Sequence, residues 1–145
     1  FPNHPLVARA SLELAQAAFK RNQFKEASTL AKPASESDDE AVQVEALLIM
    51  GESDLKQRRF QAALKAFQAA AAVEGVDPTL RLRALAGSGL AHEELDQPQE
   101  AARLYAEVAA ESPDAELQKW AQERLKAARA KAKPPAKPKA EKPKS

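Results

Sequence analysis

Apolar residues recur along this chain at spacings of three and four, which is the period of an amphipathic α-helix. The clearest series are Leu12, Ala15 and Phe19; Leu64, Phe67 and Ala71; and Leu117, Ala121 and Leu125. From this period we predict seven helices, near residues 5–21, 24–34, 39–57, 60–74, 78–95, 98–111 and 113–131. Because the intervening segments are short, neighbouring helices should form antiparallel hairpins.

Proline and acidic residues mark several helix starts. Pro78, Pro98 and Pro113 each precede a run of helix formers, at the position where a missing N–H group costs a helix least. Ser37 with Glu40 three residues later matches a capping box. Pro33 should end or kink the second helix, since its ring clashes with the preceding turn.

One unit of sequence is repeated three times. The segments QFKEASTLA from Gln23, RFQAALKAF from Arg59 and QPQEAARLY from Gln97 align at offsets of 36 and 38 residues. Each first helix carries a small residue, namely Ala15, Gly51 or Gly89. Each second helix carries an alanine, namely Ala27, Ala63 or Ala101. We interpret these as sites where the two helices of a hairpin approach closely. The predicted fold is all-α, an α-α superhelix of three helix hairpins and a C-terminal capping helix.

Over about residues 6–131 the chain resembles the tetratricopeptide repeat family, whose pattern combines a Leu-Gly site, an alanine and an aromatic residue with a period near 34. The second repeat has Leu47, Met50, Gly51, Ala63 and Phe67, the third Leu85, Gly89, Ala101, Tyr105 and Pro113, and the first Leu14, Ala15, Phe24 and Ala27. The chain departs from the pattern at three positions. Ala31 replaces the aromatic residue of the second helix, and Asp54 and His92 replace the aromatic residue expected after the glycine of the first helix. The resemblance implies repeats near 6–38, 39–77 and 78–112.

The resemblance also implies a concave groove lined by the first helices, which would hold an extended peptide or a partner helix. Carried over by position, the groove residues are Arg9, Leu12, Gln16, Phe19, Glu45, Leu48, Glu52, Leu55, Arg83, Ala86, Leu90 and Glu93. The alternative is that Leu12, Leu48 and Leu55 pack between adjacent repeats. The subfamily that grips a C-terminal carboxylate uses a clamp of Lys, Asn and Arg. Most of the clamp positions hold other residues here, namely Leu12, Gln16, Ile49 and Gly87, and only Arg83 remains, so that ligand class is disfavoured.

The last predicted helix, 113–131, suits a cap on the stack. Leu117, Trp120, Ala121 and Leu125 line one face, whereas Glu116, Lys119, Glu123 and Lys126 occupy the other. A terminal repeat needs such a polar outer face. Trp120 is therefore interpreted as a core residue rather than as a ligand anchor.

Composition removes most catalytic chemistry. The chain has no cysteine and two histidines, His4 and His92, and alanine fills 33 positions against nine for Val, Ile and Thr together. Of the polar cluster around His92, only Asp96 shares its helical face, which does not make a metal site. The acidic run from Glu36 to Glu40 fits a helix N-terminus instead. With no organised nucleophile and base, we expect neither an enzyme nor a cofactor.

The net charge of +1 conceals two parts of opposite sign. Residues 131–145 hold six Lys against one Glu, which leaves the preceding 130 residues at −4. Residues 132–145 contain four prolines and no large apolar side chain, so we predict a disordered tail. Its candidate contacts to a polyanion are Lys133, Lys137, Lys139, Lys142 and Lys144.

Two functions remain open. The first is a non-enzymatic protein–protein interaction scaffold, with a bacterial cell-envelope assembly as the suspected setting and the cytoplasm as the alternative. The second is a polyanion-binding adaptor whose tail binds anionic lipid, cell-wall polymer or nucleic acid. The alternative for the tail is a solvated spacer that binds nothing. No apolar run is long enough to cross a bilayer. Because residue 1 is Phe, we expect that a preceding segment was removed or left out.

Overall fold

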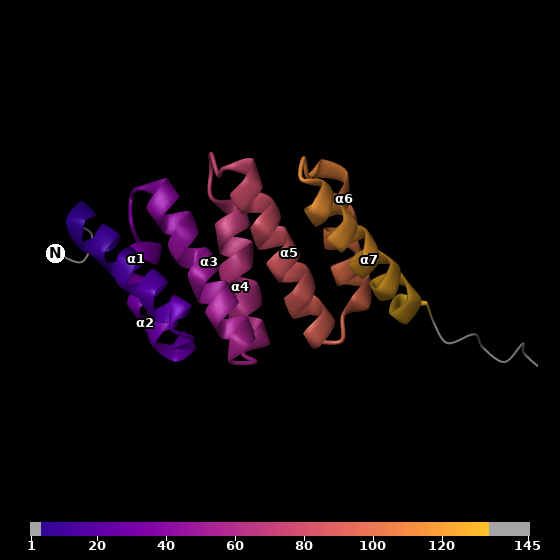
Figure 1. The fold of residues 1–145 in the computed structure, drawn as a ribbon, viewed down its shortest axis with the longest axis horizontal. Coiled ribbons are helices and arrows are strands. Elements are labelled where there is room, and N and C mark those ends of the chain that lie inside the picture. The colour runs from indigo at the N-terminus through magenta and orange to yellow at the C-terminus, as the bar shows by residue number, and fades with distance from the viewer. Residues whose placement is uncertain (1–3, 134–145) are drawn as a thin grey trace, which may run out of the picture.

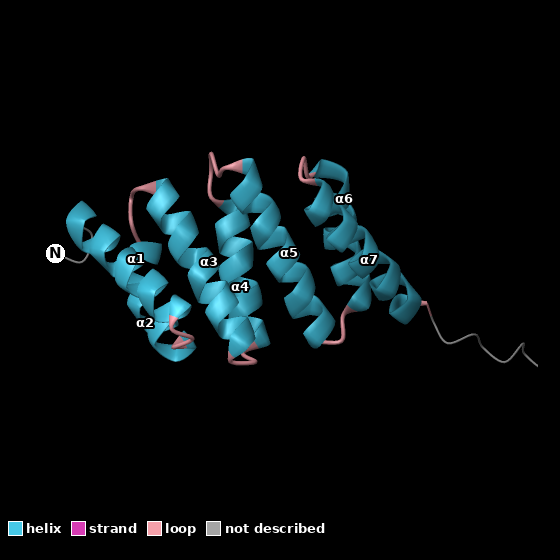
Figure 2. Cartoon of the chain, viewed as in Figure 1, coloured by secondary structure: helices cyan, strands magenta, loops and turns pink. Residues whose placement is uncertain are grey.

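A computed structural model describes residues 4–133 and shows seven α-helices, with no strand in that part of the chain (Figure 2). The helices are α1 Pro5–Lys20, α2 Phe24–Ser35, α3 Glu40–Lys56, α4 Phe60–Ala72, α5 Pro78–Glu94, α6 Pro98–Glu111 and α7 Ala115–Ala132. All seven predicted helices are present, with ends that differ from prediction by a few residues at most. The second helix continues through Pro33 to Ser35 rather than ending there.

The three hairpin turns share one backbone geometry. Asn22, Arg58 and Asp96 each adopt a left-handed conformation, with φ of 61°, 62° and 58°. The next residue donates its N–H back to the last turn of the first helix, as Arg59 does to the Asp54 carbonyl at 2.8 Å. These positions are separated by the same offsets as the sequence repeat, so the repeat extends to the turns. Non-glycine residues seldom adopt this conformation, and Asn and Asp tolerate it best.

The links that follow the first and third hairpins use a serine and an aspartate two residues later. Asp39 caps α3 by accepting hydrogen bonds from the N–H groups of Ala41 and Val42, and its own N–H donates to the Ser37 hydroxyl at 3.1 Å. Asp114 and Ser112 repeat this arrangement before α7. The predicted capping box is therefore corrected: the aspartate is the cap, and the serine orients it. The same device moves the start of α7 from residue 113 to Ala115.

The helices follow one another in a stack, from indigo α1 at one end to yellow α7 at the other (Figure 1). Each helix packs on its neighbours in sequence, and α3 also contacts both α1 and α5, so these first helices form a row. The fold is thus the predicted all-α repeat of hairpins completed by a seventh helix. Because each hairpin buries its apolar face on the next, no single hairpin has a complete core of its own.

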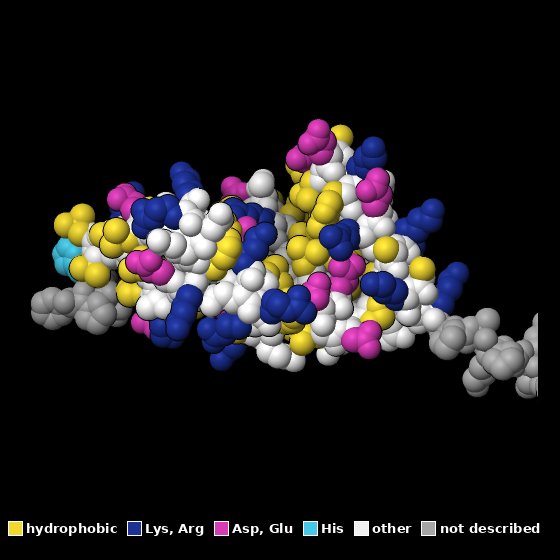
Figure 3. Space-filling view, turned by 60° about the horizontal axis from the view of Figure 1, so that its bottom comes forward, with side chains coloured by type: hydrophobic (Ala, Val, Ile, Leu, Met, Phe, Trp, Pro, Cys, Tyr) yellow, Lys and Arg dark blue, Asp and Glu magenta, His cyan; other side chains and the backbone are white. Residues whose placement is uncertain are grey.

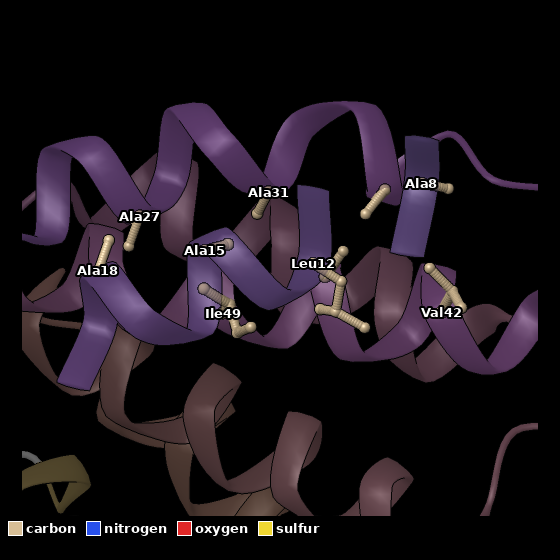
Figure 4. Packing of buried hydrophobic residues seen from close by; sticks show 10 residues of the cluster. Ala8, Leu12, Ala15, Ala18, Ala27, Ala31, Val42 and Ile49 are labelled. Carbon is tan, nitrogen blue, oxygen red and sulfur yellow. The ribbon is translucent and has the colours of Figure 1, made fainter. Parts of the chain in front are cut away.

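Small side chains fill the interior of the first hairpin. Ala15, Ala27 and Ala31 are fully buried, and Leu12 and Ile49 pack against this alanine layer (Figure 4). The second and third hairpins differ because each second helix carries an aromatic ring. A methyl group on Gly51 would lie 2.7 Å from the Phe67 ring, and one on Gly89 would lie 2.6 Å from the Tyr105 ring. These glycines admit a ring against the backbone, which refines the prediction that they bring helix against helix.

Helix α7 covers the end of the stack by packing on α6. Ala121 is fully buried, and the Trp120 ring meets the Tyr105 ring edge to face at 5.6 Å between centroids. Glu116, Lys119, Glu123 and Lys126 are exposed, as predicted for a polar outer face. Of the predicted tail, Lys133 follows α7 and is exposed, whereas Lys137, Lys139, Lys142 and Lys144 lie outside the described residues.

Candidate partner-binding site

A hollow of about 710 Å³ opens along the row of first helices. Helix α5 contributes the largest share of its lining residues, and further ones come from the C-terminal end of α3 and the N-terminal half of α7. Its large apolar lining residues are Phe19, Leu55, Phe60, Phe67, Leu90, Leu117 and Trp120. Residues from α1, α3, α4, α5 and α7 thus meet at one place, although the chain separates them widely.

The hollow exists because the row of helices widens towards its C-terminal end. The backbones of α1 and α3 and those of α3 and α5 approach closely, whereas α5 and α7 do so much less. Side chains bridge the wider gap, and the Arg124 guanidinium donates to the Glu93 carboxylate at 2.8 Å across it. Figure 3 shows one face of the molecule, on which apolar surface lies among charged groups of both signs.

Charged groups border the apolar lining. The Arg83 guanidinium on α5 donates to the Glu52 carboxylate on α3, and Lys56, Glu94 and Asp114 stand around the same opening. Burial raises the pKa of Glu52 above its ordinary value, against the opposing effect of Arg83. This ion pair is therefore partly desolvated, and a bound ligand could exchange partners with either member.

A second hollow of about 300 Å³ adjoins the first one. It is lined by Gln16, Phe19, Lys20, Glu45, Ile49 and Arg83. Phe19 and Arg83 belong to both hollows, so the two form a continuous surface along α1, α3 and α5. The smaller hollow is the more polar part of this surface.

Most of the groove residues predicted from the family resemblance border these hollows. Phe19, Glu52, Leu55, Arg83, Ala86 and Leu90 line the larger one, and Gln16 and Glu45 join Phe19 and Arg83 in the smaller one.

The other four lie elsewhere. Leu12 and Leu48 are 6% and 1% exposed inside the hydrophobic clusters, so the packing alternative holds for these two leucines. Arg9 lines neither hollow and stands 3.9 Å from Asp39. Glu93 lines neither hollow and is held by Arg124. Leu12 and Leu48 are therefore corrected to core residues, whereas Arg9 and Glu93 as partner contacts stay a prediction.

Several lining residues were not predicted as groove residues. Phe60 and Phe67 come from a second helix, whereas Leu117 and Trp120 come from the cap. The apolar face of the cap was identified in the sequence, but it was assigned wholly to the core. Trp120 does pack on Tyr105, and it also lines the hollow. The position of α7 relative to α5 was needed to see this, and no local pattern encodes it.

Tyr105 lies behind this wall and has a structural role. It is fully buried, and its hydroxyl has no hydrogen-bond partner among the described residues. Burial raises the pKa of Tyr105 strongly, and the negative charge of Glu93 raises it further. The phenol therefore stays neutral and cannot serve as a base at neutral pH.

Residues 4–133 contain no group of three or more His, Cys, Asp or Glu side chains placed to hold a metal ion. His92 is buried, and its Nδ1 lies 2.7 Å from the Gln97 Oε1. It is thus a packed helix residue that ties α5 to the start of α6. What the surface offers is apolar contact area with charged groups around it.

Neither the known protein-family models nor the curated protein sequences match this chain. None of the described helices is both long and apolar enough to span a bilayer. The fold and the hollow define a helical-repeat protein with an open, mainly apolar surface on one side.

Proposed function

We propose that this protein is a non-enzymatic interaction module that holds a peptide or partner helix in the larger hollow. The observation that carries the proposal is the apolar lining contributed by five helices, in a volume of about 710 Å³. Exposed apolar surface bordered by charge is typical of protein-interaction sites. The likeness of the sequence to tetratricopeptide repeats, which bind peptides along their first helices, supports the same function.

The lining favours a ligand with at least one large apolar side chain. Leu55, Leu90 and Leu117 offer aliphatic contact, and Trp120 offers an aromatic surface of the kind that dominates binding energy at interfaces. Arg83 and Glu52 could then orient the ligand by pairing with its polar groups.

Trp120 provides a direct test because it is the only tryptophan of the chain. Proteins of the source organism that the immobilised chain retains would be identified. The peptide segment that binds would then be titrated into the chain while its tryptophan emission is recorded. We expect an emission shift and a binding constant that changes little in about 0.5 M salt, because apolar contacts are not screened.

Variants locate the binding on the surface. Leu90→Lys should weaken binding of that peptide about tenfold or more, because a charge would be placed in the apolar lining. The matched control is Ala130→Lys, which adds the same charge on an exposed part of α7. Equal affinity of both variants, with both folded by circular dichroism, would contradict the proposed site.

A further inference from the structure

The large hydrophobic side chains that the described structure leaves exposed all belong to α1. Leu6, Val7 and Leu14 are 72%, 45% and 55% exposed. Together with Ala10 and Ala17 they form what we call the α1 end face, at the α1 end of the stack, and none of these five residues lines either hollow. Apolar atoms at this end are visible in Figure 3.

The same positions in the other first helices are packing positions. Leu6 corresponds to Val42 and Leu80, and Ala10 corresponds to Ala46 and Ala84, by the repeat offsets of 36 and 38 residues. In α3 and α5 these residues pack against the preceding hairpin. The α1 end face therefore has the pattern of a surface that is covered by a helix.

Glu13 shows what kind of helix can cover it. Its equivalents are Ile49, which packs in the alanine layer, and Gly87, which faces the Phe67 ring. A further hairpin with an apolar second helix would bury the Glu13 carboxylate without a partner, which is strongly unfavourable. A covering helix that brings a positive charge to this edge avoids that cost.

A second copy of α1 brings that charge. Arg9 lies one helical turn before Glu13, so the two residues occupy the same edge of the helix. The Arg9 guanidinium stands 3.9 Å from the Asp39 carboxylate of its own chain, but its side chain is 65% exposed and accessible to a second copy. When two such helices face each other across a two-fold axis perpendicular to both, they run antiparallel and keep this edge on the same side. Arg9 of each copy then stands opposite Glu13 of the other, whereas a parallel pair would place these edges on opposite sides.

The apolar residues fit the same register. Centring the pair at the level of Ser11 places Val7 opposite Leu14 of the second copy and Leu6 opposite Ala17 of the second copy. Ala10 then lies close to the axis, where a small side chain permits close approach of the two helices. Charge and apolar pairs thus share one centre, as a two-fold contact requires. We propose that the α1 end face joins two copies of this chain through an antiparallel α1–α1 contact.

The first test is the mass of the full chain in solution, by sedimentation equilibrium up to millimolar concentration. We expect a monomer–dimer equilibrium that approaches twice the chain mass of 15.7 kDa. Leu14→Glu should shift it to the monomer, and circular dichroism should be unchanged because the side chain is exposed. A wild-type chain that stays monomeric, or a dimer that Leu14→Glu leaves intact, would overturn the proposal.

Charge reversal tests the antiparallel register. Arg9→Glu and Glu13→Arg should each raise the dimer dissociation constant about tenfold, since each variant sets like charges opposite one another. Mixing the two variants should restore affinity in a mixed dimer. Both changes in one chain should likewise restore the dimer of that double variant. Glu123→Arg, an equivalent change on the exposed face of α7, should have no effect. Weakening without recovery in the mixture would argue against this register.

Cross-linking provides a readout that is independent of affinity. Because the chain has no cysteine, a single introduced thiol reports one position only. Ala10→Cys should form a disulfide-linked dimer quickly under mild oxidation, since the two positions meet near the axis. Ala110→Cys on the exposed side of α6 is the control. Equal rates for the two variants would mean that α1 does not face its copy.

Discussion

The Phe67 ring on α4 fills the space that a side chain on Gly87 of α5 would need. A methyl group on Gly87 would lie 2.5 Å from the ring, and one on Gly51 of α3 would lie 2.7 Å from the same ring. One ring thus joins two successive hairpins. In the first hairpin Ala31 takes the place of the ring, and Ile49 takes the place of Gly87. The volume lost in one helix is recovered in the next.

Gly87→Ala should therefore destabilise the protein, although alanine is the better helix former by about 1 kcal/mol. We expect a loss of about 2 kcal/mol in the free energy of unfolding, because the ring must move. Chemical denaturation measures it. Phe67→Ala alone should cost about 3 to 5 kcal/mol. In the double variant the cost of Gly87→Ala should disappear, and strict additivity would contradict the contact.

Trp120→Ala should lower the free energy of unfolding by about 3 kcal/mol, because the cap would lose its contact with Tyr105. Thermal and denaturant melts measure the effect. Trp120→Phe is the control, since a smaller ring still reaches Tyr105 and should retain most of the stability. A melting curve that barely moves in Trp120→Ala would show that α7 does not stabilise the stack.

Asp54 should make stability depend on pH. The residue is 5% exposed, and burial raises the pKa of its carboxyl above the ordinary value of 3.8 despite Arg59 and Ser28. The folded state then holds this proton more tightly than the unfolded state, so this group adds stability as pH falls through its folded pKa. Asp54→Asn should raise the free energy of unfolding at pH 7, and the gain should vanish below the unfolded pKa. Asp38→Asn, at an exposed site, is the control. A stability gain from Asp54→Asn that is larger at acidic pH than at pH 7 would contradict this prediction.

The basic C-terminal segment tests the alternative polyanion function. Removing residues 134–145 leaves α7 whole and takes away four lysines and one glutamate. If the segment binds polyanions, retention on vesicles of anionic lipid should be lost on truncation, and in the intact chain it should fall steeply with salt. Peptide binding in the hollow should not change. Unchanged retention after truncation would exclude this role for the segment.

The sequence alone was sufficient for the helices and their order. The spacing of Leu12, Ala15 and Phe19, and its equivalents in later helices, predicts helices because one turn takes 3.6 residues. The repeat offsets predicted the hairpins, and the three turns recur at the same offsets, with a left-handed residue at Asn22, Arg58 and Asp96. All of this information is local, and neighbouring residues can encode it.

Only the tertiary structure decided which side chains face outward. Leu48 and Leu55 lie on one first helix and have the same chemistry, yet Leu48 is buried and Leu55 lines the hollow. The difference depends on how far α7 stands from α5 and on where Phe67 and Trp120 place their rings. Such separations are set by the summed packing of side chains from several helices, which no single window of sequence contains.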